Sequence, residues 1–314
     1  MGAELIRTPG IIAAALTPFT PERRLDVAAL ERQIDYIVEE CRAAAVSIGA
    51  VETAEYTVLD PADRRELIRR GVAAVRRRVP CIVGVSHPHL PTALELIELA
   101  EACGADAVQA LAPQRPWGGA PATAEVVGYF EELLRHTRLP LVVYLNPGPG
   151  AELPIATCVE LAKLDGVAYF KESSRDLRRV GRLLEEIDRA GHARYYTTME
   201  MLLITLLLGG PGATMPPPAV RLGEELCAAF AAGDYARAAE LQRRFALFPA
   251  RWIHYGLTPL MKFAMRHVGV DVGEPAPPYQ GLSPADRAAV AAELTRIGLA
   301  PAAASGARAR GGDA

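Results

Sequence analysis

The sequence predicts an α/β protein, a (β/α)8 TIM barrel with a C-terminal helical appendage. Short apolar runs alternate with longer amphipathic segments through most of the 314 residues, which is the pattern of repeated βα units. Eight such units in one chain fit a closed barrel better than an open sheet. Neither GxGxxG nor GxxxxGK[ST] follows the first apolar run, which argues against a nucleotide-binding sheet.

The predicted strands are the short apolar runs. They are Ile11–Leu16, Ala45–Ile48, Cys81–Val85, Ala107–Leu111, Leu141–Tyr144, Val167–Lys171, Tyr195–Thr198 and Ala213–Met215. Apolar residues recur at helical spacing in segments 26–40, 61–75, 91–103 and 176–187. Pro61 and Pro91 stand where the first turn of a helix accepts proline.

Three further helical patterns follow the eighth unit. They cover Tyr235–Phe248, Leu257–Val268 and Pro284–Ile297. We therefore expect a barrel over residues 1–231 and a helical region over 232–300. The Ala/Gly/Arg-rich segment 301–314 has no periodicity, and we expect it to be a disordered tail.

The composition is that of an ordinary globular protein and excludes several classes of partner. The net charge is -3 and 23% of residues are charged, without a basic patch for nucleic acid or an anionic membrane. The N-terminus lacks a secretory pattern and the apolar stretch Met201–Leu208 is too short to span a bilayer. We expect a soluble cytoplasmic protein with five reduced cysteines.

The motif GVAYFKESSRD places Lys171 at the end of the sixth predicted strand. The chain has only two other lysines, Lys163 and Lys262, which lie in helical patterns where a surface role is expected. Apolar surroundings lower the pKa of a lysine, and a free amine can attack a ketone to form a Schiff base, which arginine cannot. The alternative is a strand-end lysine that reaches solvent or pairs with Glu172.

Tyr144 closes the fifth predicted strand in the motif LVVYLNPGPG. Active sites of such barrels lie at the carboxyl ends of the strands. A phenol one strand away from Lys171 can relay protons during imine and carbon-carbon bond chemistry. The alternative is an aromatic side chain that only packs at the mouth of the barrel.

The loop after the second strand, IGAVETAEYTVLD, is a candidate carboxylate site. Small residues in a turn can present backbone N–H groups to a 2-oxo acid, and Thr53 adds a hydroxyl. Glu52 and Glu55 either act on the substrate or bond the backbone of the loop. We assign Glu52, Thr53 and Ala54 to substrate binding.

Other strand ends offer further polar side chains. Arg115 and Trp117 follow the fourth strand and either hold a substrate carboxylate or face a neighbouring subunit. His87 and His89 have the spacing of a metal pair but lack a third ligand, so we expect no metal there. Thr214, in the last strand, completes the predicted substrate-binding set.

These motifs together resemble the dihydrodipicolinate synthase / N-acetylneuraminate lyase family of class I aldolase-type barrels. The resemblance runs from about Gly10 to Ala300, through GIIAAALTPFT, YLNPGPG, FKESSRDLRRV, GGPGATMPPPAV and GLTPLMKFAM. It implies that Lys171 is the Schiff-base nucleophile and that Tyr144 is the tyrosine of the family's Tyr-Asn-x-Pro turn. The family's Gly-Thr-Thr-Gly-Glu carboxylate loop corresponds to residues 51–55.

Three departures from the synthases concern the substrate. The arginine that holds the aldehyde substrate's carboxylate is replaced by Pro149, and the first threonine of the loop by Glu52. The tyrosine pair after strand four reads Gln114-Arg115. We therefore expect a protein that is not a true dihydrodipicolinate synthase.

The predicted function is a Schiff-base-forming lyase that acts on pyruvate or a related 2-oxo acid, with an aldehyde as a possible second substrate. The alternatives are a 2-oxo-3-deoxy sugar acid dehydratase that uses the same imine, and a non-catalytic barrel that binds a 2-oxo acid. The lysine imine is itself an electron sink, so no cofactor or metal is expected. The resemblance further implies a homo-oligomer, a dimer or tetramer.

Overall fold

A computed structural model describes residues 5–51, 55–115, 121–146 and 152–300, and in it eight parallel strands form a closed barrel in the order β1 to β8. The predicted (β/α)8 TIM barrel is confirmed. The strands are β1 (Gly10–Ala14), β2 (Ala45–Ile48), β3 (Cys81–Gly84), β4 (Ala107–Leu111), β5 (Leu141–Leu145), β6 (Val167–Glu172), β7 (Arg194–Thr198) and β8 (Gly212–Met215).

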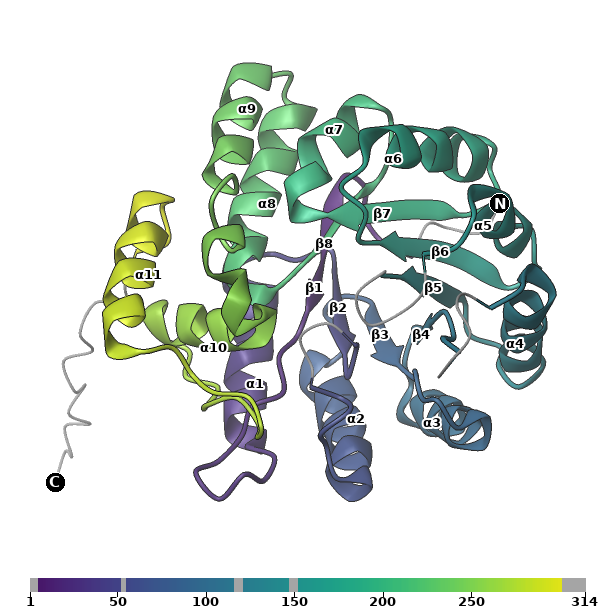
Figure 1. Ribbon diagram of the computed structural model, residues 1–314, viewed down its shortest axis with the longest axis horizontal. Coiled ribbons are helices and arrows are strands. Elements are labelled where there is room, and N and C mark those ends of the chain that lie inside the picture. Colours follow the sequence, from purple (N-terminus) through teal and green to yellow (C-terminus); the bar gives the residue numbers. More distant parts are fainter. Residues whose placement is uncertain (1–4, 52–54, 116–120, 147–151, 301–314) are drawn as a thin grey trace, which may run out of the picture.

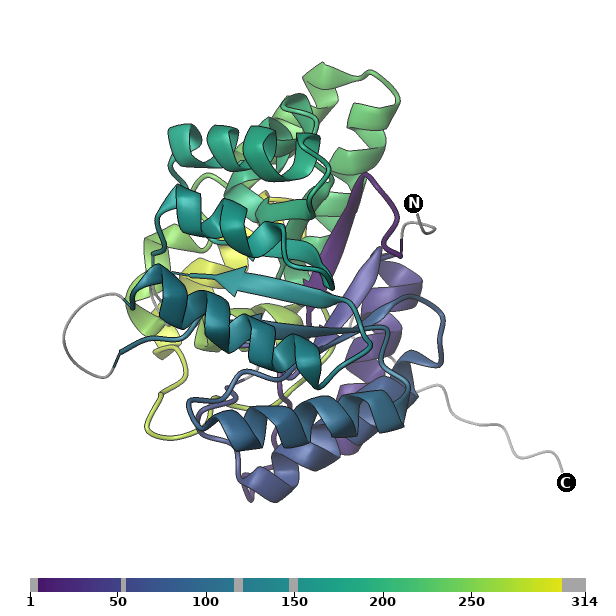
Figure 2. The same ribbon diagram turned by 90° about the vertical axis from the view of Figure 1, so that its right-hand side faces the viewer.

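Helices α1 to α8 alternate with the strands and surround the barrel (Figures 1 and 2). They are α1 (Val27–Asp35), α2 (Pro61–Val75), α3 (Leu90–Cys103), α4 (Thr123–Arg135), α5 (Ile155–Ala162), α6 (Leu177–Leu183), α7 (Leu202–Leu207) and α8 (Pro217–Ala231). Shorter segments extend or precede some of them: η1 (Tyr36–Glu40), η2 (Leu184–Arg189) and η3 (Met199–Met201). Aspartate side chains cap several N-termini, as Asp60 does for α2.

The C-terminal helices lie on the α8 side of the barrel (Figure 1). They are α9 (Tyr235–Arg244), η4 (Ala250–Tyr255), α10 (Leu257–His267) and α11 (Pro284–Arg296). In the part of the chain that the structure describes, no helix is long and apolar enough to cross a bilayer.

The lower part of the barrel interior, toward the amino ends of the strands, is filled by an apolar cluster. Seven strands contribute one side chain each to it. These side chains are Ile12, Ala45, Ile82, Ala107, Val142, Tyr169 and Tyr196. Side chains alternate between the two faces of a strand, so residues two positions further along each strand also point inward. This alternation determines which polar residues line the upper interior.

Several element boundaries differ from the predicted ones, and two of these differences have local reasons. The first strand ends at Ala14, not Leu16, because the Gln33 side chain bonds both the N–H (2.8 Å) and the carbonyl (2.9 Å) of Leu16 and replaces a strand neighbour. Helix α9 ends at Arg244, not Phe248. Pro249 restricts the preceding residue to extended backbone conformations.

Candidate active site

Lys171 and Tyr144 lie side by side at the carboxyl ends of β6 and β5. The two residues are register partners in adjacent parallel strands, so their side chains point the same way. The Lys171 Nζ lies 4.0 Å from the centre of the Tyr144 ring, and the two residues are 1% and 0% exposed. An amine and a phenol are thus held together, shielded from water.

The Tyr144 hydroxyl accepts a hydrogen bond of 2.6 Å from the Asn146 side-chain amide. Its ring packs with Val51, Leu111 and Tyr56. Because Val51 and Tyr56 lie in the loop after β2, these two loop residues and the tyrosine share one packing unit. Tyr144 therefore has a fixed ring position and an oriented hydroxyl.

Glu172, the residue after Lys171, points to the opposite face of β6. One of its carboxylate oxygens accepts a 2.6 Å bond from Arg179 Nε, and the other accepts a bond from the Tyr195 hydroxyl. Arg179 also donates to the Leu153 carbonyl, at 2.8 Å. Burial, followed by the charge of Glu172, raises the pKa of Tyr195 well above its ordinary value. The alternative pairing of Lys171 with Glu172 is therefore wrong.

The same alternation surrounds Lys171 with polar side chains from the other even-numbered strands. Ala45, Ala107 and Tyr169 belong to the interior cluster, and two residues later come Ser47, Gln109 and Lys171. In β8, Thr214 is the register partner of the inward-pointing Ile12. Barrels of this fold stack their inward side chains in layers of four from alternate strands. We call Ser47, Gln109, Lys171 and Thr214 the lysine layer.

Three members of the lysine layer have buried polar atoms without a protein partner. They are Ser47 Oγ, Gln109 Nε2 and Thr214 Oγ1, for which no hydrogen bond is formed within the described residues. All three residues are at most 5% exposed. A buried polar group without a partner costs about 1–3 kcal/mol, so these atoms together indicate a site that receives polar groups of a ligand or water.

The other predicted substrate-binding residues lie in three different settings. Thr214 belongs to the lysine layer. Glu52, Thr53, Ala54, Trp117 and Pro149 lie outside the described residues. Arg115 is 40% exposed and its guanidinium bonds Glu125 at 2.6 Å, at the start of α4. Its role in holding a substrate carboxylate stays a prediction.

The two histidines after β3 contact each other. The backbone N–H of His89 donates to His87 Nδ1 at 3.0 Å, and His89 Nδ1 lies 2.9 Å from the Thr92 hydroxyl. Across the four described ranges, no cluster of three or more His, Cys, Asp or Glu side chains is arranged to hold a metal ion.

One prediction about the lysines was wrong. Lys163 is exposed at the end of α5, but Lys262 in α10 is 2% exposed and forms an ion pair with Glu55 at 2.8 Å. Its helical pattern could have shown this, because the neighbouring Met261 and Met265 are buried on the same helix. The partner Glu55 lies in a distant loop that no helical pattern indicates.

Ser47 and Gln109 were not predicted as site residues. Each is a single polar residue inside a four- or five-residue apolar strand, AVSI and AVQAL. Both faces of a parallel barrel strand are buried, so the sequence shows that such a residue needs a polar partner but not whether it faces the interior or a helix.

Comparison with known proteins extends this picture. The model of the dihydrodipicolinate synthetase family matches residues 7–297. The 4-hydroxy-tetrahydrodipicolinate synthase of Methylococcus capsulatus is 30% identical over 265 residues, which are 83% of this chain and 89% of that protein.

Solved structures share the architecture. A putative dihydrodipicolinate synthetase from Pseudomonas aeruginosa matches with a TM-score of 0.84 and 25% identity, over 93% of this chain and 100% of that one. N-acetylneuraminate lyase from Mycoplasma synoviae matches with a TM-score of 0.80 and 22% identity, over 92% and 98%. The second likeness concerns the fold alone.

Proposed function

Because this chain belongs to the dihydrodipicolinate synthetase family, we propose that it is a Schiff-base-forming lyase that acts on a 2-oxo acid. The observation that carries the proposal is the buried amine of Lys171, 4.0 Å from the Tyr144 ring at the ends of two adjacent strands. Burial disfavours the charged ammonium form, and a free amine is the nucleophile that imine formation needs.

The reaction begins with attack of Lys171 Nζ on C2 of the 2-oxo acid. The resulting carbinolamine loses water to give a protonated imine, which accepts the electron pair of the C3–C4 bond as that bond breaks and an aldehyde leaves. The enamine then takes up a proton at C3, and water releases pyruvate or its analogue. In the reverse direction the enamine adds to the aldehyde.

Tyr144 is the proposed proton relay for these steps. Its hydroxyl accepts a bond from Asn146 at 2.6 Å, which stabilises negative charge on the phenol oxygen when it gives up its proton. It gives that proton to the oxygen that leaves the carbinolamine as water, and the phenolate that remains takes up the next proton that the substrate releases. Formation and cleavage of the imine both require this exchange.

The lysine layer supports a substrate with polar substituents. Ser47, Gln109 and Thr214 offer polar atoms in the same layer as the amine that have no hydrogen-bond partner among the described residues, and a 2-oxo acid derived from a sugar acid carries hydroxyl groups for them. The same observation favours the second candidate, a 2-oxo-3-deoxy sugar acid dehydratase. Analysis of the products separates the two, because a lyase releases an aldehyde and a dehydratase releases water.

Differences from the synthases support a reaction other than dihydrodipicolinate synthesis. The sequence has Pro149 where those enzymes have the arginine for the aldehyde substrate's carboxylate, and Arg115 is paired with Glu125. A homo-oligomer and a cytoplasmic location remain predictions.

Borohydride trapping tests the imine. The protein is incubated with pyruvate and borohydride, and peptide mass spectrometry locates the reduced adduct among the three lysines. We expect the adduct on Lys171 and none in Lys171→Arg or Lys171→Met, with circular dichroism to verify that these variants fold. If pyruvate and several longer 2-oxo acids give no adduct on Lys171, the Schiff-base function is excluded.

A further inference from the structure

A second buried lysine lies outside the barrel, on α10. Lys262 Nζ is 2.8 Å from Glu55 Oε2, and the two side chains are 2% and 4% exposed. The same Nζ donates to the Glu274 carbonyl at 3.0 Å. Burial lowers the pKa of Lys262, and the charge of Glu55 opposes that shift. Lys262 is thus held in place by a carboxylate and a backbone carbonyl on a helix outside the barrel.

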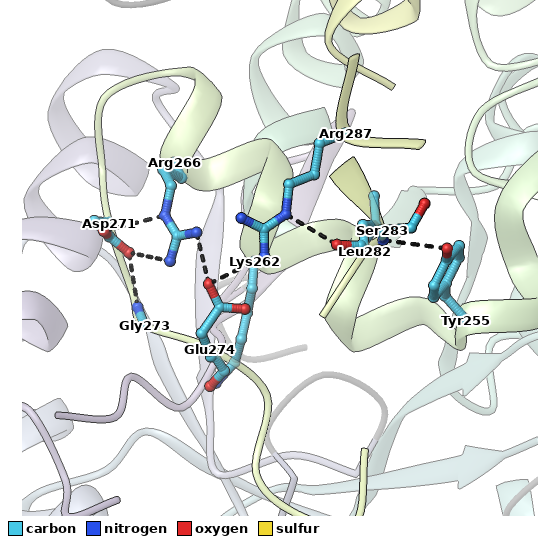
Figure 3. A network of polar contacts seen from close by, with 9 residues as sticks. All are labelled: Tyr255, Lys262, Arg266, Asp271, Gly273, Glu274, Leu282, Ser283 and Arg287. Atoms are coloured by element: carbon cyan, nitrogen blue, oxygen red, sulfur yellow. Dashed lines mark hydrogen bonds and ion pairs between the residues drawn. The ribbon is translucent and has the colours of Figure 1, made fainter. Parts of the chain in front are cut away.

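The ion pair ties the loop after β2 to the C-terminal segment. The second oxygen of Glu55 accepts a 2.7 Å bond from the Ala276 N–H, so both oxygens bind the region around α10. Glu274, whose carbonyl receives Lys262, is itself held by Arg266 at 2.7 Å, and Arg266 also binds Asp271 (Figure 3). The position of Glu55 therefore depends on an extended polar network.

The loop after β1 is attached to the same point. Lys262 Nζ lies 4.3 Å from the centre of the Phe19 ring, and the Phe19 N–H donates to the Val272 carbonyl at 3.2 Å. A side chain on Gly273 would lie 2.1 Å from the Phe19 carbonyl oxygen, and its φ of +78° suits glycine. The loops after β1 and β2 thus both contact the C-terminal segment 262–276.

Glu55 is adjacent in the chain to the packing unit of Tyr144. Tyr56 directly follows it, and Tyr56 and Val51 both contact the cluster that contains Tyr144. The position of Glu55 therefore constrains the backbone of the residue that packs against this cluster. Glu55 also has a left-handed backbone, with φ +50°, a conformation that a non-glycine residue keeps only where its surroundings hold it.

We propose that the Glu55–Lys262 ion pair positions Tyr144 for proton transfer, so that the C-terminal helical region is part of the catalytic apparatus. Neither residue belongs to the lysine layer; both act through Tyr56, which follows Glu55 in the chain and packs against the cluster that contains Tyr144. The proposal rests on the Schiff-base function proposed above, and it assigns to Lys262 a role that Lys171 does not share.

A double variant tests this without leaving a single buried charge. Removal of one partner of a buried pair is strongly destabilising, whereas neutral replacement of both is tolerated better. The variant is Glu55→Gln with Lys262→Met. The measurement is the rate of adduct formation on Lys171 at saturating pyruvate with borohydride, with circular dichroism as the check of folding.

We expect the double variant to slow adduct formation about tenfold, and by less than about twofold when Tyr144→Phe is already present. Coupled residues give such non-additive effects, whereas independent residues give the same factor in both backgrounds. A purely structural contribution would not depend on the hydroxyl of Tyr144. The control is Arg7→Met with Glu224→Gln, a more exposed ion pair at the amino end of β1, which should leave the rate unchanged.

Glu55→Asp is a second variant that keeps both charges and suits the left-handed backbone. It should slow adduct formation about threefold, again only when the Tyr144 hydroxyl is present. An unchanged rate in both variants, or the same reduction with and without that hydroxyl, would overturn the positioning role alone. A parent protein that forms no adduct on Lys171 would overturn the Schiff-base function and the positioning role together.

Discussion

Lys171 and Glu172 are adjacent in β6, but their surroundings differ in one decisive respect. On the outer face, Glu172 uses both carboxylate oxygens in bonds to Arg179 and Tyr195. On the inner face, the lysine layer includes buried atoms of Ser47, Gln109 and Thr214 that bond to nothing within the described residues. Networks with every group bonded stabilise a fold, whereas buried groups without partners identify where a ligand is received.

The largest effect on the inner face is expected from Tyr144→Phe. Loss of the hydroxyl removes the proposed proton relay, and general acid–base catalysis contributes about 10²–10⁴-fold in rate. Adduct formation on Lys171 should slow by that factor but not stop, since the amine remains. Tyr169→Phe is the matched control in the apolar layer below; an equal loss in both variants would assign the effect to packing.

The largest effect on the outer face is expected from Arg179→Met. The change leaves Glu172 buried without its cation, and such losses cost about 3–5 kcal/mol in the free energy of unfolding. Chemical denaturation measures it. Arg182→Met breaks a pair with Glu186 whose side chains are 61% and 38% exposed, and should cost less than about 1 kcal/mol. A similar loss in the free energy of unfolding for Arg179→Met and Arg182→Met would contradict the view that the buried Glu172 network stabilises the fold.

Gln109→Leu tests whether a polar side chain on the inner face serves substrate binding at a cost in stability. The Gln109 Nε2 has no hydrogen-bond partner in the described part of the chain, so its replacement should leave the free energy of unfolding unchanged or raise it by about 1–3 kcal/mol, while kcat/KM for the 2-oxo acid falls. Gln33→Leu is the control, because the Gln33 side chain bonds both backbone groups of Leu16 and its loss should destabilise. A destabilised Gln109→Leu would show that the amide is structural.

Tyr195→Phe removes one of the two donors to Glu172, and the pH-dependent part of its effect, the smallest change considered, appears at alkaline pH. The pKa of Tyr195 is raised well above its ordinary value of 10.0, by burial and then by Glu172. Above pH 10 the unfolded chain releases this proton and the folded chain keeps it, so stability falls as pH rises. The variant should lack this contribution, about 1.4 kcal/mol per pH unit. If the free energy of unfolding falls equally steeply with pH in the parent protein and in Tyr195→Phe, Tyr195 does not make this contribution.

The sequence predicted the barrel and its proposed nucleophile better than the surroundings of that nucleophile. Alternation of short apolar runs with amphipathic segments reports on local structure, and Lys171 stands at a strand end where chemistry is expected. The partners of Lys262 were missed because an ion pair between distant segments leaves no periodic signal. Gln109 was missed because a strand buried on both faces does not reveal which face a polar residue occupies.

The bond between Glu55 and the Ala276 N–H joins residues 221 positions apart. During synthesis at about 5–20 residues per second, Glu55 leaves the ribosome roughly 10–40 seconds before Ala276 is added. For that interval the second βα unit carries a carboxylate that has neither its cation nor its amide donor. The carboxylate of Glu55 therefore stays without these two partners until the last quarter of the polypeptide is made, and a chain that terminates before α10 lacks both of them.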